Sequence, residues 1–426
     1  MRCSAGVFFT WLTFLGCRQT PVAPKATGVV VLSDAGNPLE SSGDSLAGVK
    51  TTSGRIAVSN LDGQIEEFTR LLDKSARRAD MLQSLATLLP VRAQFLGRVE
   101  DYDLALADAE AVIALRPKDP KAYLTRAHAR SSLHQFKDAS SDLDEAARLG
   151  GNRLADEIDA SRASILQATG HTTEAQEILQ RRAKNDPEIL TMGALGLTLA
   201  DQGKITEADG VLAKAPLSYF GGLPFPVAWI EFQRGFLWER QGQPTKAIGY
   251  YRAAIERLPE YAVARAHLAG LIAAEGDREK GIAILREVTK TATDPEFVGQ
   301  LAGLLAEVGQ RDEAARTKEQ ATAGFEKLIA KHPAAFADHA ARFYLGPGAN
   351  PKRALELAKL NLEGRQTPDA FDLGLTAALE GGDSATACKL AGEAATAMPA
   401  IPTPHLTFLV GKGREACGAP TPARMQ

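Results

Sequence analysis

Residues 227–261 contain two stretches in which apolar positions follow a helical period. Gly242 and Pro244 separate them, because glycine permits a turn conformation and proline fixes φ. The second stretch ends at Pro259, since proline cannot continue the helical hydrogen bonds. This pattern predicts a hairpin of two amphipathic helices. Such a hairpin cannot bury its own apolar faces, so it needs copies of itself beside it.

The same register of small residues recurs along most of the chain. Ala247, in the second predicted helix, has eight counterparts at steps of 33 to 40 residues: Ala105, Ala139, Ala175, Ala208, Gly281, Ala314, Ala354 and Ala387. Twelve residues before seven of these nine positions stands another small residue: Ala93, Ala127, Ala163, Gly196, Gly235, Ala269 and Ala302. Small residues where two helices cross let their backbones approach closely. The register therefore predicts about nine stacked hairpins.

Turn and stop residues keep the same register. A glycine stands five residues before the small residue of the second helix in six copies: Gly170, Gly203, Gly242, Gly276, Gly309 and Gly382. A proline stands twelve residues after it in four copies: Pro117, Pro187, Pro259 and Pro399. Chance alignment in an alanine-rich chain would not reproduce the glycine and proline positions as well.

The period and this layout resemble the tetratricopeptide repeat family. The resemblance covers roughly residues 80–399, about three quarters of the chain. It implies an all-α fold, a right-handed superhelical solenoid of about nine helix-turn-helix repeats, in which each repeat contacts its neighbours. Two places break the period. Residues 216–227 hold three prolines and a Gly-Gly pair, which predicts an extended loop. After Ala314 the second helix is expected to run on to His332.

The N-terminus predicts export. An apolar run of nine residues, 7–15, follows a positive start. It is too short to cross a bilayer, which takes about 20 apolar residues, but it has the length of a signal-peptide core. Phe14-Leu15-Gly16-Cys17 is similar to the bacterial lipobox. That resemblance implies a lipoprotein signal peptide at residues 1–16 and lipidation of Cys17. Ordinary secretion and a cytosolic chain are the alternatives.

The residue after the predicted lipidation site bears on localisation. In bacterial lipoproteins of this kind an Asp at that place typically retains the protein in the inner membrane, and this chain has Arg18. The resemblance therefore implies an outer-membrane lipoprotein of a Gram-negative cell, facing the periplasm. Its membrane contact would be the N-terminal lipid anchor.

Residues 17–55 are rich in Gly, Ser, Thr and Pro, and we expect a flexible tether there. Within it, Gly43-Asp44-Ser45-Leu46 matches the block that names the GDSL hydrolases, which makes an envelope serine hydrolase using Ser45 the alternative function. The core strand before the block and the C-terminal Asp-x-x-His block of such enzymes are missing, so we interpret it as a chance tetrapeptide. Residues 56–418 are expected to form the array and 419–426 a disordered tail.

Residues 60–74 read as an amphipathic helix, with Asn60 or Asp62 as candidate caps. We expect this helix to cap the N-terminal end of the solenoid, and a partner-binding helix is the alternative. At the other end, Cys388 and Cys417 form an even pair in a chain predicted to be exported, which favours a disulfide. Two buried thiols are the alternative.

Composition favours binding over catalysis. The formal net charge is −3 and no Lys/Arg cluster is interleaved with aromatic residues, so we expect no nucleic-acid partner. The seven histidines lack the spacing of a helical metal pair, and no phosphate-cradling glycine loop is present. We therefore expect no cofactor, no bound metal and no enzymatic activity.

The first helices of a tetratricopeptide array line a concave groove. Mapping the fourth and fifth copies onto that arrangement places five large apolar residues there: Leu190, Leu197, Trp229, Phe232 and Phe236. An open apolar groove would bind a protein or peptide partner. The alternative is that the loop bearing Tyr219, Phe220 and Phe225 folds over this cluster. The predicted function is that of a membrane-anchored scaffold that holds other proteins, with envelope assembly as one such role.

Overall fold

The structure is a computed structural model that describes residues 49–72, 77–398 and 400–418. Its helices pair in chain order as nine hairpins: α2 (Arg78–Leu96) with α3 (Glu100–Leu115), α4 (Pro120–Ser132) with α5 (Phe136–Gly150), α6 (Ala155–Ala168) with α7 (Thr172–Asn185), α8 (Ile189–Asp201) with α9 (Ile205–Lys214), α10 (Pro224–Arg240) with α11 (Pro244–Arg257), α12 (Ala262–Ala274) with α13 (Arg278–Thr289), α14 (Pro295–Glu307) with α15 (Arg311–Lys331), α16 (Pro333–Leu345) with α17 (Pro351–Gly364), and α18 (Pro368–Glu380) with α19 (Ser384–Ala397). Helix α1 (Gly54–Leu71) precedes them and α20 (Pro404–Glu415) follows. The predicted all-α solenoid of nine helix-turn-helix repeats is confirmed.

The turn inside each hairpin needs a left-handed backbone conformation. All six glycines of the predicted turn register have positive φ, between 66° and 111°. Three copies lack a glycine at this position. In two of them His134 (φ 53°) and Ala349 (φ 50°), five residues before Ala139 and Ala354, adopt the left-handed conformation themselves. The fold therefore imposes the turn geometry even where the side chain opposes it.

Replacing Ala349 with glycine is expected to stabilise the protein. The left-handed conformation costs an L-residue about 1–2 kcal/mol, and glycine adopts it freely but loses more backbone entropy, so the net gain should be about 0.5–1 kcal/mol. Ala349 is exposed and loses no packing. The matched control is Ala107→Gly, at an exposed position in the interior of α3, which should lose about 1 kcal/mol. Chemical denaturation measures both, and a destabilised Ala349→Gly protein would contradict this account of the turn.

The small residues of the register lie where the helices of a hairpin meet. A Cβ on Gly196 would stand 2.6 Å from Leu212 Cγ and 3.3 Å from the Ala208 carbonyl oxygen. The α10–α11 hairpin differs in detail. A Cβ on Gly235 would stand 2.6 Å from the ring of Tyr251, so Gly235 makes room for that ring and not primarily for Ala247.

The N-terminal helix starts earlier than the sequence predicts. Helix α1 begins at Gly54, so Asn60 and Asp62 lie inside it and the proposed caps are wrong. Its apolar residues, Leu61 among them, are buried in the main core, so α1 covers the first end of the array. The predicted tether, 17–55, overlaps α1 by two residues, and the segment before the helix is held by a hydrogen bond of 2.7 Å from Thr52 N–H to the Gly222 carbonyl oxygen.

The expected extended loop at 216–227 is only partly correct. A short 3-10 helix, η4 (Ala215–Ser218), begins it, and α10 already starts at Pro224, leaving 219–223 outside helices. Proline is tolerated in the first turn of a helix because the missing N–H has no intrahelical acceptor there. The predicted extension of the seventh repeat is confirmed, since α15 runs for 21 residues to Lys331.

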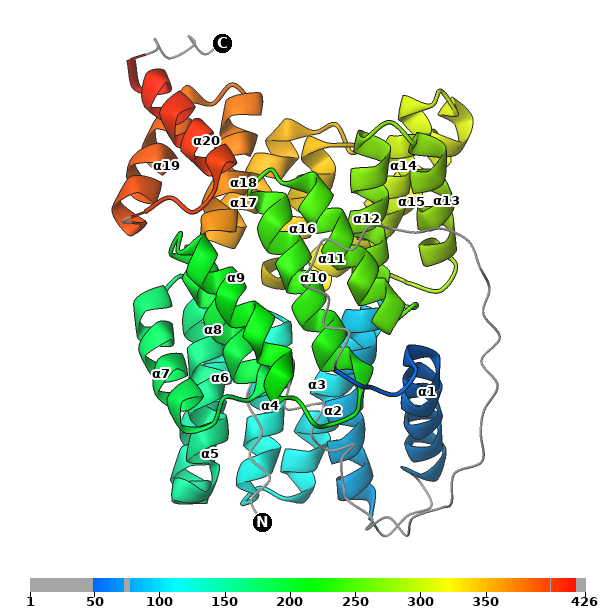
Figure 1. The fold of residues 1–426 in the computed structure, drawn as a ribbon, viewed down its shortest axis with the longest axis vertical. Helices are drawn as coiled ribbons and strands as arrows, with labels where there is room; N and C mark the ends of the chain where they lie inside the picture. Colours follow the sequence, from blue (N-terminus) through cyan, green and yellow to red (C-terminus); the bar gives the residue numbers. More distant parts are fainter. Residues whose placement is uncertain (1–48, 73–76, 399, 419–426) are drawn as a thin grey trace.

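The superhelix closes on itself. In Figure 1 the hairpins up to α9 form the lower half of the molecule, and those from α12 to α20 form the upper half, with α10 and α11 between them. Several hydrogen bonds join the upper half to the rest of the molecule, among them these three. Thr293 N–H donates to Gly97 O (2.8 Å), His134 Nδ1 lies 2.9 Å from Ala334 O, and Gln241 Nε2 donates to Pro402 O (2.8 Å). We call the zone where the upper half of the molecule meets the rest of the chain the seam.

Apolar packing reinforces the seam. Val99 and Leu133 from the first half share a buried cluster with Ala335 and Phe336 from the second. At Gly97 the approach is so close that a Cβ would stand 2.7 Å from the Phe297 ring. The partners in the hydrogen bonds above lie 161 to 200 residues apart in the chain. One superhelical turn therefore takes five or six repeats before the chain meets itself.

Candidate functional site

The five residues predicted to line an open groove do not form one. Leu190, Trp229 and Phe232 are buried, with exposed fractions of 6%, 3% and 9%. Trp229 packs into space left by Gly193 of α8, where a Cβ would stand 2.7 Å from the indole Cη2. Leu197 and Phe236 are half-buried. The expected exposed trough is wrong for the three buried residues, because glycine on the neighbouring helix lets the large side chains enter the core.

Neighbouring helices surround Phe232 on α10. Its ring centroid lies 5.5 Å from that of Tyr251 and 5.4 Å from that of Tyr261, and His267 on α12 meets it edge-on at 5.4 Å. The alternative of a covering loop is correct only in part. Phe225 is buried, but it belongs to the first turn of α10 and not to a loop. Phe220 does lie outside the helices, and it is 92% exposed. The cluster is therefore closed mainly by α8, α11 and α12.

The interior of the superhelix holds a cavity of about 370 Å³, the central cavity. Its walls come from α2 to α6, from α8 to α10 and from α18, with residues of the turns beside them, so both halves of the molecule contribute. Phe236 and Leu197 are the two predicted groove residues that reach it. The sequence did not single out its polar residues, since they come together only when the superhelix closes.

An ionic bridge crosses the central cavity. Arg240 Nη1 lies 3.4 Å from Asp201 Oδ1, and Arg240 Nη2 lies 3.0 Å from Asp369 Oδ1 on α18. Gln167 Nε2 donates to Asp201 Oδ2 at 2.7 Å. Burial raises the pKa of Asp201, and the Arg240 charge opposes that rise. A second arginine of the lining, Arg365, pairs with Asp338 at 2.9 Å. Both cations of the wall are thus neutralised by carboxylates.

A second ionic group on α10 is buried and does not line the central cavity. Arg234 is 1% exposed and donates from Nε to Asp209 Oδ1 at 2.8 Å, with its guanidinium 4.3 Å from the centre of the Tyr250 ring. Glu231, one turn earlier, is 3% exposed, and burial raises its pKa to about 7 although Arg234 opposes the shift.

Glu231→Gln is expected to stabilise the protein at pH 8 and to do little at pH 4. Burial raises the folded-state pKa of Glu231 from its ordinary 4.5 to about 7, so the folded state holds a proton that the unfolded state lacks between these values. Wild-type stability therefore falls as pH rises through this window, and glutamine removes that loss. The gain above pH 7 is at most about 3 kcal/mol. Melting temperatures at both pH values measure it, and an equal shift at both would refute the assignment.

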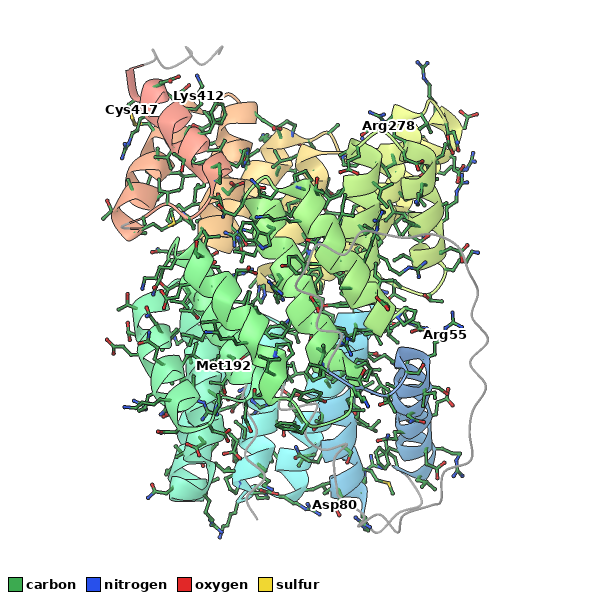
Figure 2. The ribbon with its side chains drawn as sticks, in the orientation of Figure 1. Arg55, Asp80, Met192, Arg278, Lys412 and Cys417 are labelled. Carbon is green, nitrogen blue, oxygen red and sulfur yellow. A yellow bond between two sulfur atoms is a disulfide. The ribbon has the colours of Figure 1, made fainter. Side chains whose placement is uncertain are left out.

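The remaining predicted residues fall in two groups. Cys17 and Ser45 lie outside the described residues. Cys388 in α19 and Cys417, just after α20, are joined by a disulfide with their Cα atoms 4.9 Å apart. Figure 2 shows Cys417 near the C-terminal end of the chain, at the edge of the stack far from Arg55 on α1.

Neither a metal centre nor a membrane span is found in the part of the chain that the structure describes. Within it, no three His, Cys, Asp or Glu side chains are grouped to hold an ion. No helix among these residues is both long and apolar enough to cross a bilayer.

One protein family and several solved structures are similar to this chain. Residues 240–299 match the family model described as tetratricopeptide repeat. No curated protein matches the chain. Among solved structures, yeast Tom70 is 15% identical with a TM-score of 0.33 over 85% of this chain and 93% of that one. Cut9–Hcn1 of APC/C is 13% identical with a TM-score of 0.42 over 84% and 74%, and the human IFIT1 dimer with PPP-AAAA is 17% identical with 0.45 over 76% and 78%.

At these identities nothing about partners or ligands is transferred from those structures. The fold defines a helical repeat solenoid, an architecture that suggests a protein–protein interaction scaffold. Residues 240–299 match the tetratricopeptide repeat model, and the nine hairpins keep one register along the chain.

Proposed function

We propose that this protein is a membrane-anchored scaffold that binds other proteins in the bacterial envelope. A lipid on Cys17 would hold it at the outer membrane, facing the periplasm, and the array would present its surface to partners there. The observation that carries the proposal is the closed solenoid of nine repeats. Its described part starts only 32 residues after Cys17, which puts the array within reach of an anchor.

Among the residues that the structure describes, the connection between α9 and α10 offers an apolar candidate for partner contact. Leu217 and Phe220, in the connection between α9 and α10, are 66% and 92% exposed. Large apolar side chains that remain exposed close together often mark an interaction site. We call the connection that bears Leu217 and Phe220 the exposed loop. It replaces the buried groove residues as the place where we expect a partner to bind.

Cys17→Ala is expected to release the protein from membranes into the soluble fraction, because several buried acyl chains provide the anchor at about 0.8 kcal/mol per CH₂. Cell fractionation followed by a high-salt wash measures this. A variant that still pellets after the wash would show that lipidation at Cys17 is not what holds the protein.

Partner binding is tested by pull-down from detergent-solubilised envelopes followed by mass spectrometry. We expect one or a few envelope proteins to co-purify with the wild type, and fewer with Leu217→Ser/Phe220→Ser. Leu115→Ser, at another exposed leucine, is the matched control and should not change the set. Recovery of the same proteins in the same amounts with all three chains would reject the exposed loop as the contact.

A further inference from the structure

We propose that the central cavity binds a small uncharged polyhydroxylated ligand, a mono- or disaccharide. The proposal is independent of the scaffold function and concerns the interior of the superhelix. A volume of about 370 Å³ lies at the lower end of the range of small-molecule sites, about 300–1,000 Å³. The ligand would touch both halves of the molecule and so hold the seam closed.

The charges on the wall are already paired. Arg240 lies between Asp201 and Asp369, and Arg365 is held by Asp338 and by a hydrogen bond of 3.4 Å from its Nε to the Ala168 carbonyl oxygen. A charged ligand would have to displace one of these partners and leave a half-buried charge without compensation, which is costly. The wall therefore favours a neutral ligand.

His134 also meets the cavity as a neutral group. Burial lowers its pKa to about 4. Its Nδ1 lies 2.9 Å from the Ala334 carbonyl oxygen, which can only accept, so Nδ1 carries the proton and Nε2 is an acceptor. The seam thereby fixes the tautomer of a cavity residue.

Four neutral polar side chains of the wall are open for a ligand. Gln94, Tyr102, Ser131 and Gln233 are half-buried, and their side chains make no hydrogen bond to any residue that the structure describes. Amides and hydroxyls can each donate and accept, as sugar hydroxyls do. The wall also holds Phe136 and Phe236. His134 stacks on Phe136 and Arg240 lies over Phe236, and the ring surface that these groups leave uncovered suits the C–H faces of a sugar ring. Paired charges, open neutral groups and aromatic faces together match a saccharide.

An extended peptide fits less well. The contacts from His134 to Ala334, from Arg365 to Ala168 and from Arg240 to Asp369 join the two halves around the cavity. A strand running through the superhelix would have to break them. A compact ligand needs no such opening.

Isothermal titration calorimetry of the full folded chain tests the proposal. The probes are glucose, N-acetylglucosamine, cellobiose and diacetylchitobiose, with glutamate, lysine and an N-acetylated, C-amidated tetra-alanine as comparisons. We expect at least one saccharide to bind and the charged probes and the peptide not to bind. Gln94→Leu/Gln233→Leu should weaken saccharide binding about tenfold, as the loss of two hydrogen bonds implies. Gln180→Leu, on an exposed surface of α7, is the matched control and should bind as the wild type does.

Three results would overturn the proposal: no saccharide binds the wild type, the peptide or a charged probe binds in its place, or the double variant binds as tightly as Gln180→Leu. Circular dichroism establishes that each variant is folded. If the double variant does not fold, Phe136→Leu takes its place. It removes one aromatic face and should weaken the same saccharide, and unchanged affinity in that variant would equally reject the cavity as the site.

Discussion

Trp229→Ala is expected to lower the free energy of unfolding by about 3–5 kcal/mol, the usual cost of truncating a buried Trp. Trp229 is 3% exposed and fills the space beside Gly193, so alanine leaves a cavity between α8 and α10. Because each repeat of a solenoid contacts mainly its neighbours, this loss weakens one interface in the middle of the array. Urea denaturation followed by circular dichroism measures the change and shows whether unfolding separates into two transitions.

Trp238→Ala is the matched control on the same helix. Trp238 is half-buried and packs under the ammonium of Lys246, 3.8 Å from the ring centre. Its loss should cost less than half as much. A small effect of Trp229→Ala, together with reduced binding of a partner, would restore the open groove that the sequence suggested and contradict the packing described here.

Removing the disulfide with Cys388→Ser/Cys417→Ser is expected to destabilise the C-terminal end by up to about 3–4 kcal/mol, the chain-entropy value for a loop of this length. The bond closes a sequence separation of 29 and ties α20 to α19. Leu406, Leu409 and Val410 still hold α20 against the last repeat, so we expect local loosening and not global unfolding. Hydrogen exchange of the α20 amides, compared with those of α2, measures the effect.

Reduced wild-type protein should behave as the double serine variant does. Equal protection of α20 in oxidised, reduced and serine forms would mean that the bond adds nothing to stability. The bond also bears on export, because disulfides persist in oxidising compartments such as the periplasm. A non-reducing mass measurement on protein isolated from the native cell would show whether the bond forms there.

Local features of the fold could be predicted because they depend on nearby residues. The turn glycines located the hairpins along the chain, because a positive φ depends on the residue at a single position. The length of α15 followed from continuous apolar spacing up to Pro333. The early start of α10 was missed, because prolines in its first turn read as a loop although they also suit a helix start.

The candidate site could not be predicted because it depends on distant residues. Burial of Trp229 required the absent side chain of Gly193 on another repeat. The central cavity required the chain to return after five or six repeats, bringing Asp369 to Arg240. Nothing in the spacing of these residues along the chain marks them as neighbours. The left-handed turns at His134 and Ala349 were likewise missed, since neither position carries the glycine that usually marks that conformation.

Site-specific photo-crosslinking in the native cell tests the scaffold most directly. A photoreactive phenylalanine analogue at Phe220, in the exposed loop, should give a discrete adduct with an envelope protein. The same analogue at Leu115 should not, and the adduct from Phe220 should diminish when Cys17→Ala removes the anchor. No adduct from Phe220, or the same adducts from both positions, would contradict the account of an anchored scaffold that binds its partner through this loop.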